Sequence, residues 1–294
     1  MSIRKRRLTC LLFTPVLKEG WAEKAWNWQP DGVILDLEDS IPESDKDKAR
    51  KMAKLISNNS PKNWFLRINS IGSGHWEEDL HIALTTNIAG ILIPKVENPE
   101  DVTKIHKFLT ESVFTFSNSH DLPVLVPIIE TALGLENVMR IATSSPLIYT
   151  LAFGAADFTN DIWLEGNPSR AVLEHAKFRI SIASRAAGLY SPHDSPYFKL
   201  EDADGLLQEV LEAKTLAFGG KYAIHPSQIK VIKDNFRPTN EEMKRALTIV
   251  SMFENGLKEG KAAIRVNNEM VDYPIFKRAK NLILEYGTNG EFHV

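Results

Sequence analysis

The chain has 294 residues, of which 43% are hydrophobic and 25% charged, and its formal net charge is −3. This balance is that of an ordinary globular protein, long enough to bury one large core or two modest ones. Because the chain carries no net positive charge, it has no general attraction for nucleic acid or anionic lipid, and we expect neither nucleic acid nor a membrane as a partner.

The N-terminal segment begins with a short basic run, "RKRR" from Arg4 to Arg7, followed by the apolar "LTCLLFTPVL". This order imitates a signal peptide, but no small-residue cleavage site follows, so we expect a solvated tail and no export. The single cysteine, Cys10, cannot form an internal disulfide, and no Cys/His cluster suggests zinc. No apolar stretch approaches the roughly 20 residues that a membrane helix needs. We therefore expect a protein of the reducing cytoplasm.

Eight short apolar runs, separated by longer polar segments of helical period, predict an alternation of strands and helices. Such βα units require a parallel sheet covered by helices, and near-continuous apolar strands fit burial on both faces. Eight units before the C-terminal segment favour an α/β fold of the closed (β/α)8 TIM-barrel type over an open doubly wound sheet. The strands are expected at residues 7–14, 32–37, 64–68, 90–94, 124–129, 149–153, 188–191 and 221–224.

The segment after the last expected strand predicts a helix, a hairpin and a second helix. "TNEEMKRALTIVSMFENGLKEG" has helical period and a cap at Thr239 or Asn240, and Asn267-Asn268 suits a tight reversal before the helical "PIFKRAKNLILEYG". No low-complexity linker precedes this segment. We therefore expect a barrel over residues 1–237 and a helix–hairpin–helix arm over residues 238–294.

The carboxyl ends of the expected strands, where a barrel builds its active site, collect ionisable side chains. One such acid is often only a neighbour of a helix cap, but several facing carboxylates repel one another unless a cation or a shared proton neutralises them. Hard oxygen ligands without His or Cys favour Mg²⁺ or Mn²⁺ over zinc, with positions left for water and a chelating substrate. These residues are Asp36, Glu38, Asp39, Arg67, Asn69, Lys95, Glu97, Glu130, Asp157 and His225.

The second strand, in "GVILDLED", alternates apolar and acidic residues. Side chains of a strand point to its two faces in turn, so the apolar set can face the helices and leave Ile34, Asp36 and Glu38 inside the barrel. The alternative is a strand whose acids serve only in structural ion pairs. Arg67 leaves the next strand from an apolar context, and a guanidinium there suits an oxyanion or a carboxylate.

The motifs along the chain are, in order, "LLFTP", "GVILDLEDSIPESDKDKAR", "FLRIN", "GILIPKVEN", "IIETALGL", "LAFGAADFTND", "AIHPSQI" and "MVDYPIFKRA". Together they resemble the citrate lyase β-subunit family within the HpcH/HpaI aldolase superfamily, whose members include citryl-CoA and malyl-CoA lyases. The resemblance covers essentially the whole chain. It implies a TIM barrel with a C-terminal arm, dependence on Mg²⁺, and cleavage or formation of a carbon–carbon bond in a 3-hydroxyacyl thioester of CoA.

The resemblance also implies roles for five strand-end residues. Glu130 and Asp157 would be the metal ligands and, together with Arg67, would bind the substrate. Arg67 would face the thioester oxygen as it becomes an enolate. Glu38 and Asp39 would act in catalysis by holding the waters of the metal. The alternation of the strand does not favour Asp39, whose role depends on the resemblance alone.

The same resemblance places the thioester carrier along "AIHPSQ", largely through backbone groups, and near the first strand. There the family usually has an Arg before the apolar block and a "PG.RPE" turn after it, whereas this chain has Thr9, Val16 and Lys18. Lys in place of Arg exchanges a bidentate fork for a point charge, so both CoA and an acyl-carrier protein stay open as the carrier. His225 could equally be a hydrogen-bonded core histidine. The expected carrier-binding residues are Lys18, Ile224, His225 and Pro226.

The second arm of the hairpin carries Asp272 among apolar neighbours. An acid just before Pro274 could simply cap the last helix. However, the barrel offers no good candidate for the acid that protonates the departing carbon, and in the resembled family the Asp of this motif comes from a neighbouring subunit. We therefore expect the arm to pack on the next subunit of a cyclic homo-oligomer, a trimer or a hexamer, with Asp272 as proton donor and acceptor.

Two other functions stay open. A CoA-independent aldolase working through a pyruvate enolate would use the same metal scaffold, although the "HPSQ" and "MVD" motifs argue against it. A non-catalytic or carrier-protein-dependent subunit of a lyase complex is compatible with the altered first strand, although both metal carboxylates are retained. The motifs do not choose among malyl, citramalyl, β-methylmalyl and citryl thioesters.

Overall fold

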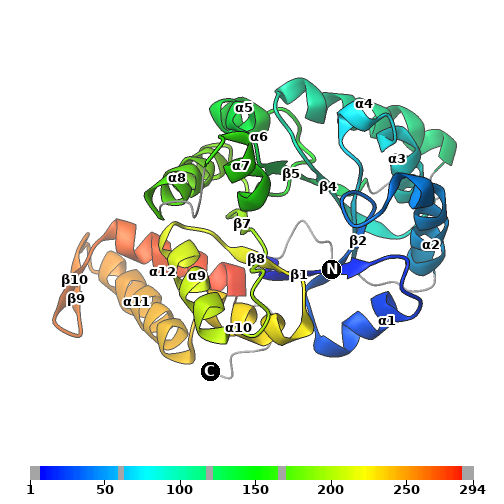
Figure 1. The fold of residues 1–294 in the computed structure, drawn as a ribbon. Coiled ribbons are helices and arrows are strands. Elements are labelled where there is room, and N and C mark those ends of the chain that lie inside the picture. The colour runs from blue at the N-terminus through cyan, green and yellow to red at the C-terminus, as the bar shows by residue number, and fades with distance from the viewer. Residues whose placement is uncertain (1–6, 59–62, 117–121, 165–169, 287–294) are drawn as a thin grey trace. The chain divides into compact units, whose positions relative to one another are not determined.

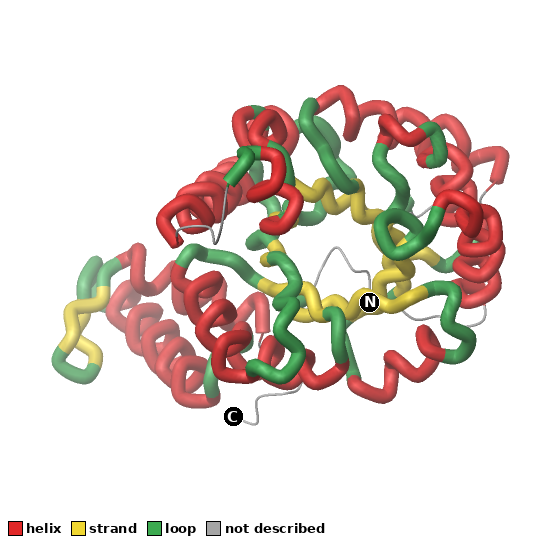
Figure 2. Tube along the Cα trace, in the orientation of Figure 1, coloured by secondary structure: helices red, strands yellow, loops and turns green. Residues whose placement is uncertain are grey.

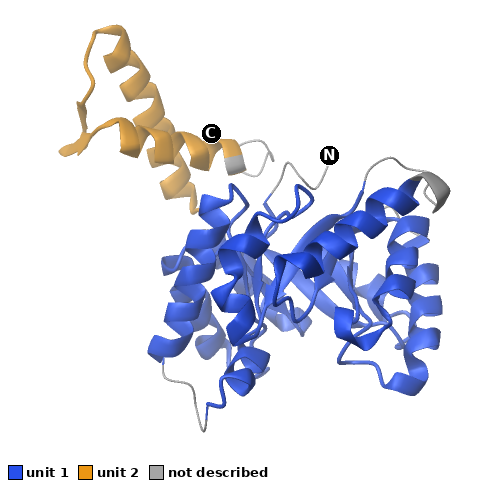
Figure 3. Cartoon of the chain, turned by 90° about the horizontal axis from the view of Figure 1, so that it is seen from above, with its two compact units in different colours: residues 1–236 blue, residues 237–294 orange. Residues whose placement is uncertain are grey.

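The computed structural model describes residues 7–58, 63–116, 122–164 and 170–286, and the chain divides into two compact units, residues 1–236 and 237–294 (Figure 3). In the first unit eight parallel strands close into a barrel in sequence order, with helices outside it (Figures 1 and 2). The expected TIM barrel is confirmed. The strands are β1 (Cys10–Pro15), β2 (Gly32–Asp36), β3 (Trp64–Arg67), β4 (Ile88–Ile93), β5 (Val124–Ile129), β6 (Ala152–Phe153), β7 (His193–Asp194) and β8 (Gly220–Ala223).

The helices of the first unit pack an apolar stripe against the barrel. In α2, Ala49, Ala53 and Ile56 are buried at the spacing of one helical face, while the rest of the helix is largely charged. No described helix is both long and apolar enough to cross a membrane. The helices are α1 (Trp21–Ala25), α2 (Lys46–Asn58), α3 (Trp76–Thr85), α4 (Pro99–Phe116), α5 (Ala132–Glu136), α6 (Val138–Ala142), α7 (Ala155–Asp161), α8 (Arg170–Ala186), α9 (Ala203–Thr215) and α10 (Pro226–Phe236), with short 3₁₀ turns η2 (Trp26–Trp28), η3 (Glu43–Asp45) and η4 (Ile71–Ser73).

Alternation along the strands divides the apolar residues between two layers. Ile34 of β2 joins Phe65 of β3 inside the barrel. Its neighbours Val33 and Leu35 instead pack in the layer between the strands and the helices. The face pattern expected for "GVILDLED" is therefore confirmed. Phe65 fills the interior next to Gly90, where an added Cβ would lie 2.3 Å from its ring, so β4 needs a residue without a side chain there.

The expected seventh strand, at residues 188–191, is wrong. The strand is His193–Asp194, and β6 covers only the last two residues of the expected 149–153. The sequence does not predict β7 because a barrel strand is expected to be apolar and both residues of β7 are polar. Both side chains are nevertheless buried, and each has a partner. His193 Nε2 lies 2.9 Å from a backbone carbonyl oxygen, and Asp194 accepts a hydrogen bond of 2.7 Å from Lys221.

The second unit is the expected helix–hairpin–helix. Thr239 caps its first helix in a capping box with the glutamate three residues later. Asn267 and Asn268 both have positive φ, as a two-residue hairpin turn requires. Phe253 stacks on Phe276 with ring centroids 4.7 Å apart in the core of this unit. Its elements are α11 (Asn240–Lys258), β9 (Ile264–Val266), β10 (Glu269–Val271) and α12 (Tyr273–Tyr286).

The basic run and the single cysteine of the N-terminal segment lie partly within the described residues. Arg7 is half-buried, and its Nη2 donates to the carbonyl oxygen of Phe218 at 3.5 Å, so this residue does not belong to a solvated tail. Arg4 to Arg6 lie outside the described residues. Cys10 is a buried free thiol whose pKa is raised by burial.

Candidate active site at the carboxyl ends of the barrel strands

A cavity of about 440 Å³ lies at the carboxyl ends of the barrel strands. Its wall joins residues from β1, β2, β3, β5, β6 and β8 and from segments that follow the strands, including those after β6 and β7, as expected for a barrel active site. Glu38, Lys95 and His225 are not among the lining residues. The lining includes Asp36, Asp39, Ser40, Arg67, Glu130, Asp157 and Ser195, together with the apolar or aromatic Phe13, Ile128, Phe153 and Tyr222.

Arg67 and Asp36 form a buried ion pair on neighbouring strands. Nε of Arg67 lies 2.6 Å from one carboxylate oxygen of Asp36 and Nη2 lies 2.8 Å from the other, so the fork is bidentate. Burial alone would raise the pKa of Asp36, but the hydrogen bonds and charge of Arg67 hold it below its ordinary value. Burial would lower the pKa of Arg67, and its acidic neighbours raise it instead. Asp36 is therefore the structural partner of Arg67, as the alternative for this strand held.

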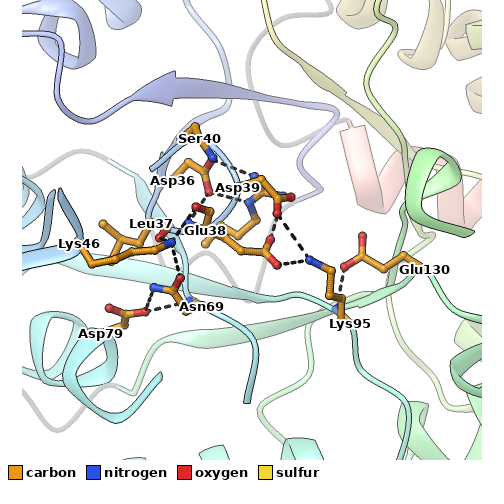
Figure 4. A network of polar contacts seen from close by, with 11 residues as sticks. Asp36, Leu37, Glu38, Asp39, Ser40, Lys46, Asn69, Asp79, Lys95 and Glu130 are labelled. Carbon is orange, nitrogen blue, oxygen red and sulfur yellow. Dashed lines mark hydrogen bonds and ion pairs between the residues drawn. The ribbon is translucent and has the colours of Figure 1, made fainter. Parts of the chain in front are cut away.

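Lys95 joins the acids that follow β2 to the loop that follows β4 (Figure 4). Its Nζ donates to Glu38 at 2.7 Å and lies 3.5 Å from Asp39. The other carboxylate oxygen of Glu38 is 3.1 Å from Nη1 of Arg67, an ion pair without aligned hydrogen-bond geometry. Burial raises the pKa of Glu38, although both cations oppose the rise. Glu38 is thus held in place by two positive charges.

Glu130 follows β5 and is held by two backbone features. Its Oε1 accepts a hydrogen bond of 2.7 Å from the amide of Lys95, whose positive φ of 51° turns that N–H toward it. A Cβ added at residue 154 would lie 2.2 Å from Oε2 of Glu130, so only glycine fits at position 154. Burial, with the negative charges of Glu38 and Asp157, raises the pKa of Glu130 to about 8. The carboxylate is therefore costly to ionise unless a cation lies beside it.

A buried polar network supports the loop after β2 (Figure 4). Lys46 Nζ donates to the carbonyl oxygens of Leu37 and Glu38 at 2.7 and 2.8 Å and to Asn69 Oδ1 at 2.6 Å. Asp79, which is fully buried, accepts from both the backbone and the side-chain amide of Asn69. Sequence reasoning missed Lys46 and Asp79, and it gave Lys95 no role. The available signal was that an acidic loop such as "LDLED" needs cations to hold it.

Glu130 and Asp157 are the residues that could hold a hard divalent cation. Among the described residues no group of three or more His, Cys, Asp or Glu side chains is arranged to hold a metal, so two carboxylates would leave positions for water and a substrate. Two observations fit an ion here: the repulsion that raises the pKa of Glu130, and the absence of a side-chain hydrogen bond or ion pair to Asp157 from any described residue. Oxygen donors alone suit Mg²⁺.

The sequence over residues 9–226 matches the profile of the HpcH/HpaI aldolase/citrate lyase family. The chain belongs to this family. It is 31% identical over 288 residues to the mitochondrial citramalyl-CoA lyase of Rattus norvegicus, an alignment that covers 93% of this chain and 84% of the relative. It is 28% identical over 283 residues to the citrate lyase subunit beta of Haemophilus influenzae, covering 95% and 97%. The expected carbon–carbon lyase of this family is confirmed.

Solved structures agree with this membership of the HpcH/HpaI aldolase/citrate lyase family. CitE from Mycobacterium tuberculosis, crystallised in complex with magnesium, acetoacetate and coenzyme A, is 25% identical with a TM-score of 0.78 and covers 96% of this chain and 99% of its own. RipC from Yersinia pestis is 31% identical with a TM-score of 0.66 and covers 80% and 98%.

The departures of this chain from the family pattern in the first strand have structural explanations. Thr9 Oγ1 donates to Asp31 at 2.7 Å. Val16 is fully buried in the layer between barrel and helices. Lys18 is exposed, with its Nζ 4.4 Å from the ring centroid of Trp21, and does not line the cavity. The predicted contact of Lys18 with a carrier stays a prediction.

The family's "AIHP" stretch is partly engaged within the protein. The amides of Ile224 and His225 both donate to Gln228 Oε1, at 2.9 and 3.3 Å, so a carrier cannot use these two N–H groups. Ile224 lines the cavity, and Pro226 opens α10. His225 is exposed, with Nδ1 2.8 Å from Ser227 Oγ, so the alternative of a core histidine is wrong.

Asp272 of the second unit caps a helix. Its Oδ1 accepts a hydrogen bond of 3.3 Å from the amide of Ile275, and its carbonyl oxygen accepts one of 3.0 Å from the amide of Phe276. This is the geometry of the capping alternative. A cap does not exclude proton transfer in a neighbouring subunit, because one carboxylate oxygen stays available, so the shared site stays a prediction.

Proposed function

We propose that the protein is a Mg²⁺-dependent carbon–carbon lyase that cleaves or forms a 3-hydroxyacyl-CoA thioester, such as malyl-, citramalyl- or citryl-CoA. The observation that carries the proposal is the meeting of Glu130, Asp157 and Arg67 in one cavity of a barrel of this family. Relatives named citramalyl-CoA lyase and citrate lyase subunit beta support it, as does a CitE complex with magnesium, acetoacetate and coenzyme A.

Glu130 and Asp157 would hold the Mg²⁺. Bound there, the ion supplies a Lewis acid to the hydroxyl and carboxylate of the substrate's 2-hydroxy-acid portion. Glu130 must be deprotonated to bind it, and the adjacent positive charge offsets the burial that raises the pKa of this carboxyl. Mn²⁺ would suit the same oxygen donors.

Arg67 would bind the oxygen of the thioester as it becomes an enolate. Asp36 and Asp39 engage three of its five N–H groups, which leaves donors for a substrate oxygen. The ion pair with Asp36 fixes the guanidinium before the substrate arrives, so little reorganisation is needed in the transition state. Glu38 and Asp39, both next to Lys95, would accept hydrogen bonds from the waters of the metal site.

The thioester carrier would approach Ile224 at the cavity and Pro226 at the start of α10, with Lys18 and His225 as its basic side chains. CoA is the carrier that the CitE complex supports. The catalytic proton would come from Asp272 of an adjacent subunit in a homo-oligomer, a trimer or a hexamer, because Asp36, Glu38 and Asp39 are each already paired with a cation. The buried free thiol of Cys10 supports a reducing compartment, the cytoplasm.

A substrate screen tests the proposed function. Purified protein with Mg²⁺ should release free keto acid from at least one of the malyl, citramalyl, β-methylmalyl and citryl thioesters of CoA. A coupled assay that reduces the released keto acid measures this. No release from any CoA thioester, together with release from a carrier-protein thioester, would make the protein a carrier-dependent subunit. Cleavage of a free hydroxy-keto acid to pyruvate without any thioester would make it a CoA-independent aldolase.

Arg67→Lys should lower kcat with little change in KM. The expected loss is on the order of 2.7 to 4 kcal/mol of transition-state stabilisation, because the fork loses an oxyanion donor that acts only as charge develops. Steady-state kinetics on the preferred thioester measure this loss. Because Arg67 also neutralises the buried carboxylate of Asp36, the kinetics are measured at a temperature where circular dichroism shows that the variant is folded. A change confined to KM would instead make Arg67 a ground-state clamp for a carboxylate.

A further inference from the structure

Tyr222 lines the cavity and carries a buried hydroxyl that has no partner among the residues the structure describes. It lies on β8, is 2% exposed, and belongs to the cluster inside the barrel rather than to the layer under the helices. Its Oη has no hydrogen-bond partner among the described residues. Burying a hydroxyl without a partner costs stability, and a ligand in the cavity that supplies an acceptor would remove that cost.

The position of Tyr222 distinguishes it from another buried hydroxyl without a described partner, that of Thr14. Thr14 also lines the cavity, but its alternate neighbours Cys10 and Leu12 in β1, and Val16 just after it, pack under the helices, so the Thr14 side chain shares the face that points away from the barrel interior. Tyr222 has the opposite orientation. Its ring lines the cavity and contacts the ring of Phe13 edge-on, with centroids 5.4 Å apart.

The surroundings of Tyr222 are mainly apolar and aromatic, with the buried ring of His193 edge-on at 5.5 Å between centroids and with charge within reach. Phe13, Ile128 and Phe153 line the same cavity and offer no hydrogen-bonding side-chain group. Arg67 lies over the ring of Phe13, 5.0 Å from its centroid. Burial raises the pKa of Tyr222 so that the phenol stays a donor, with the charges of Arg67 and Glu130 acting on it in opposite directions. This part of the cavity therefore combines apolar contact with one donor and a nearby guanidinium.

We propose that Tyr222 is a specificity-determining residue whose hydroxyl donates a hydrogen bond to an oxygen on the substituent of the hydroxyl-bearing carbon of the substrate. The proposal rests on the proposed function, in which the metal site takes the hydroxyl and carboxylate and Arg67 takes the thioester oxygen. Only the remaining substituent is left for Tyr222. A carboxymethyl group gives the phenol an acceptor near the charge of Arg67, whereas a methyl group or hydrogen leaves it unpaired.

The citryl and citramalyl thioesters of CoA form a matched substrate pair, because they differ only in carrying a carboxymethyl or a methyl group at this carbon. Tyr222→Phe should lower kcat/KM for the citryl thioester on the order of tenfold to a hundredfold and leave that for the citramalyl thioester within about threefold. If Tyr222→Phe leaves the ratio of kcat/KM for the citryl thioester to that for the citramalyl thioester unchanged, whether through no loss or through an equal loss on both substrates, the proposal is overturned.

Tyr149→Phe is the matched control, since Tyr149 also belongs to the cluster inside the barrel but does not line the cavity. Its hydroxyl accepts a hydrogen bond of 3.1 Å from the amide of Leu8. Tyr149→Phe should lower the melting temperature and keep the substrate ratio. Tyr222→Phe should keep or raise the melting temperature. If this variant lowers the melting temperature as much as Tyr149→Phe does, the hydroxyl of Tyr222 has a hydrogen-bond partner within the protein, and the proposal is contradicted.

A binding measurement separates failure of this inference from failure of the proposed function. If the wild-type protein cleaves no thioester, the proposed function fails. The role of Tyr222 is then tested by calorimetric titration of the protein with oxaloacetate and with pyruvate in the presence of Mg²⁺. Tyr222→Phe should weaken oxaloacetate binding at least tenfold and leave pyruvate binding unchanged. Equal effects on the two keto acids would overturn the role of Tyr222.

Discussion

Glu130→Ala and Asp157→Ala should each abolish cleavage of the thioester while leaving the barrel folded. Without either carboxylate the two-ligand site loses the cation that supplies several kcal/mol of transition-state stabilisation, so kcat should fall at least about 1,000-fold. The fold should persist because removing one carboxylate relieves the repulsion that raises the pKa of Glu130. Release of keto acid measures activity, and circular dichroism measures folding.

Glu136→Ala is the control for these variants. Glu136 lies on α5, six residues beyond Glu130, and its exposed carboxylate pairs with Arg179 at 2.6 Å, so its loss should leave kcat unchanged. Wild-type protein should lose activity in EDTA and regain it with Mg²⁺. Full activity in EDTA, or in either site variant, would remove the metal from the mechanism.

The stability of the metal-free protein should depend on pH through Glu130. Its pKa is raised from 4.5 to about 8 in the folded state, so between these values the folded protein binds a proton that the unfolded chain has lost. The unfolding free energy should therefore fall as pH rises through this window, on the order of 5 kcal/mol in total. Urea denaturation at pH 5 and pH 8.5 in EDTA measures the fall.

Glu130→Gln identifies the residue responsible for this pH dependence, because glutamine keeps the shape of the side chain and cannot ionise. Most of the fall in stability should disappear in the variant, and Mg²⁺ should stabilise the wild-type protein at pH 8.5 but not the variant. An equal fall in both proteins would assign the titration to another group.

The apolar strands of the barrel could be predicted from the sequence, whereas its polar strand could not. β5 matches the expected residues 124–129, because a run buried on both faces has no polar residue to confuse the pattern. β7 consists of His193 and Asp194, whose buried side chains have their partners in distant parts of the chain. One of these partners, Lys221, follows 27 residues later, and a local pattern does not contain that pairing.

The site was predictable in its strand-end acids and not in its cations. Asp36 ends β2, Glu38 lies two residues beyond it and Glu130 directly follows β5, so the closure of the barrel brings these acids to the same end (Figure 4). Whether a given acid faces a substrate or a structural partner depends on three-dimensional pairing, so structural ion pairs stayed one of two alternatives for this strand, and the partner of Asp36, Arg67, was not predicted. Lys95 reaches the acids after β2 through a backbone turn of positive φ that sequence does not specify.

Asp272→Ala should abolish turnover, and Asp272→Asn should be equally inactive. Asparagine is as good a helix cap as aspartate, so Asp272→Asn keeps the bond to the amide of Ile275 and the stability of α12 but cannot carry a proton. Full activity of Asp272→Asn with impaired Asp272→Ala would leave the cap as the whole role of this residue. Keto-acid release and melting temperature, measured on both variants, decide between the two roles.

Subunit complementation tests whether Asp272 serves an adjacent barrel. Mixing inactive Asp272→Asn with inactive Glu130→Gln, after dissociation and reassembly, should restore some activity, because a shared site can take Glu130 from one chain and Asp272 from the next. Glu130→Gln suits this experiment better than a change at Arg67, which would leave the buried carboxylate of Asp36 unpaired. Inactive mixtures, with mixed oligomers demonstrated by mass spectrometry, would place both residues in one chain and contradict the shared site.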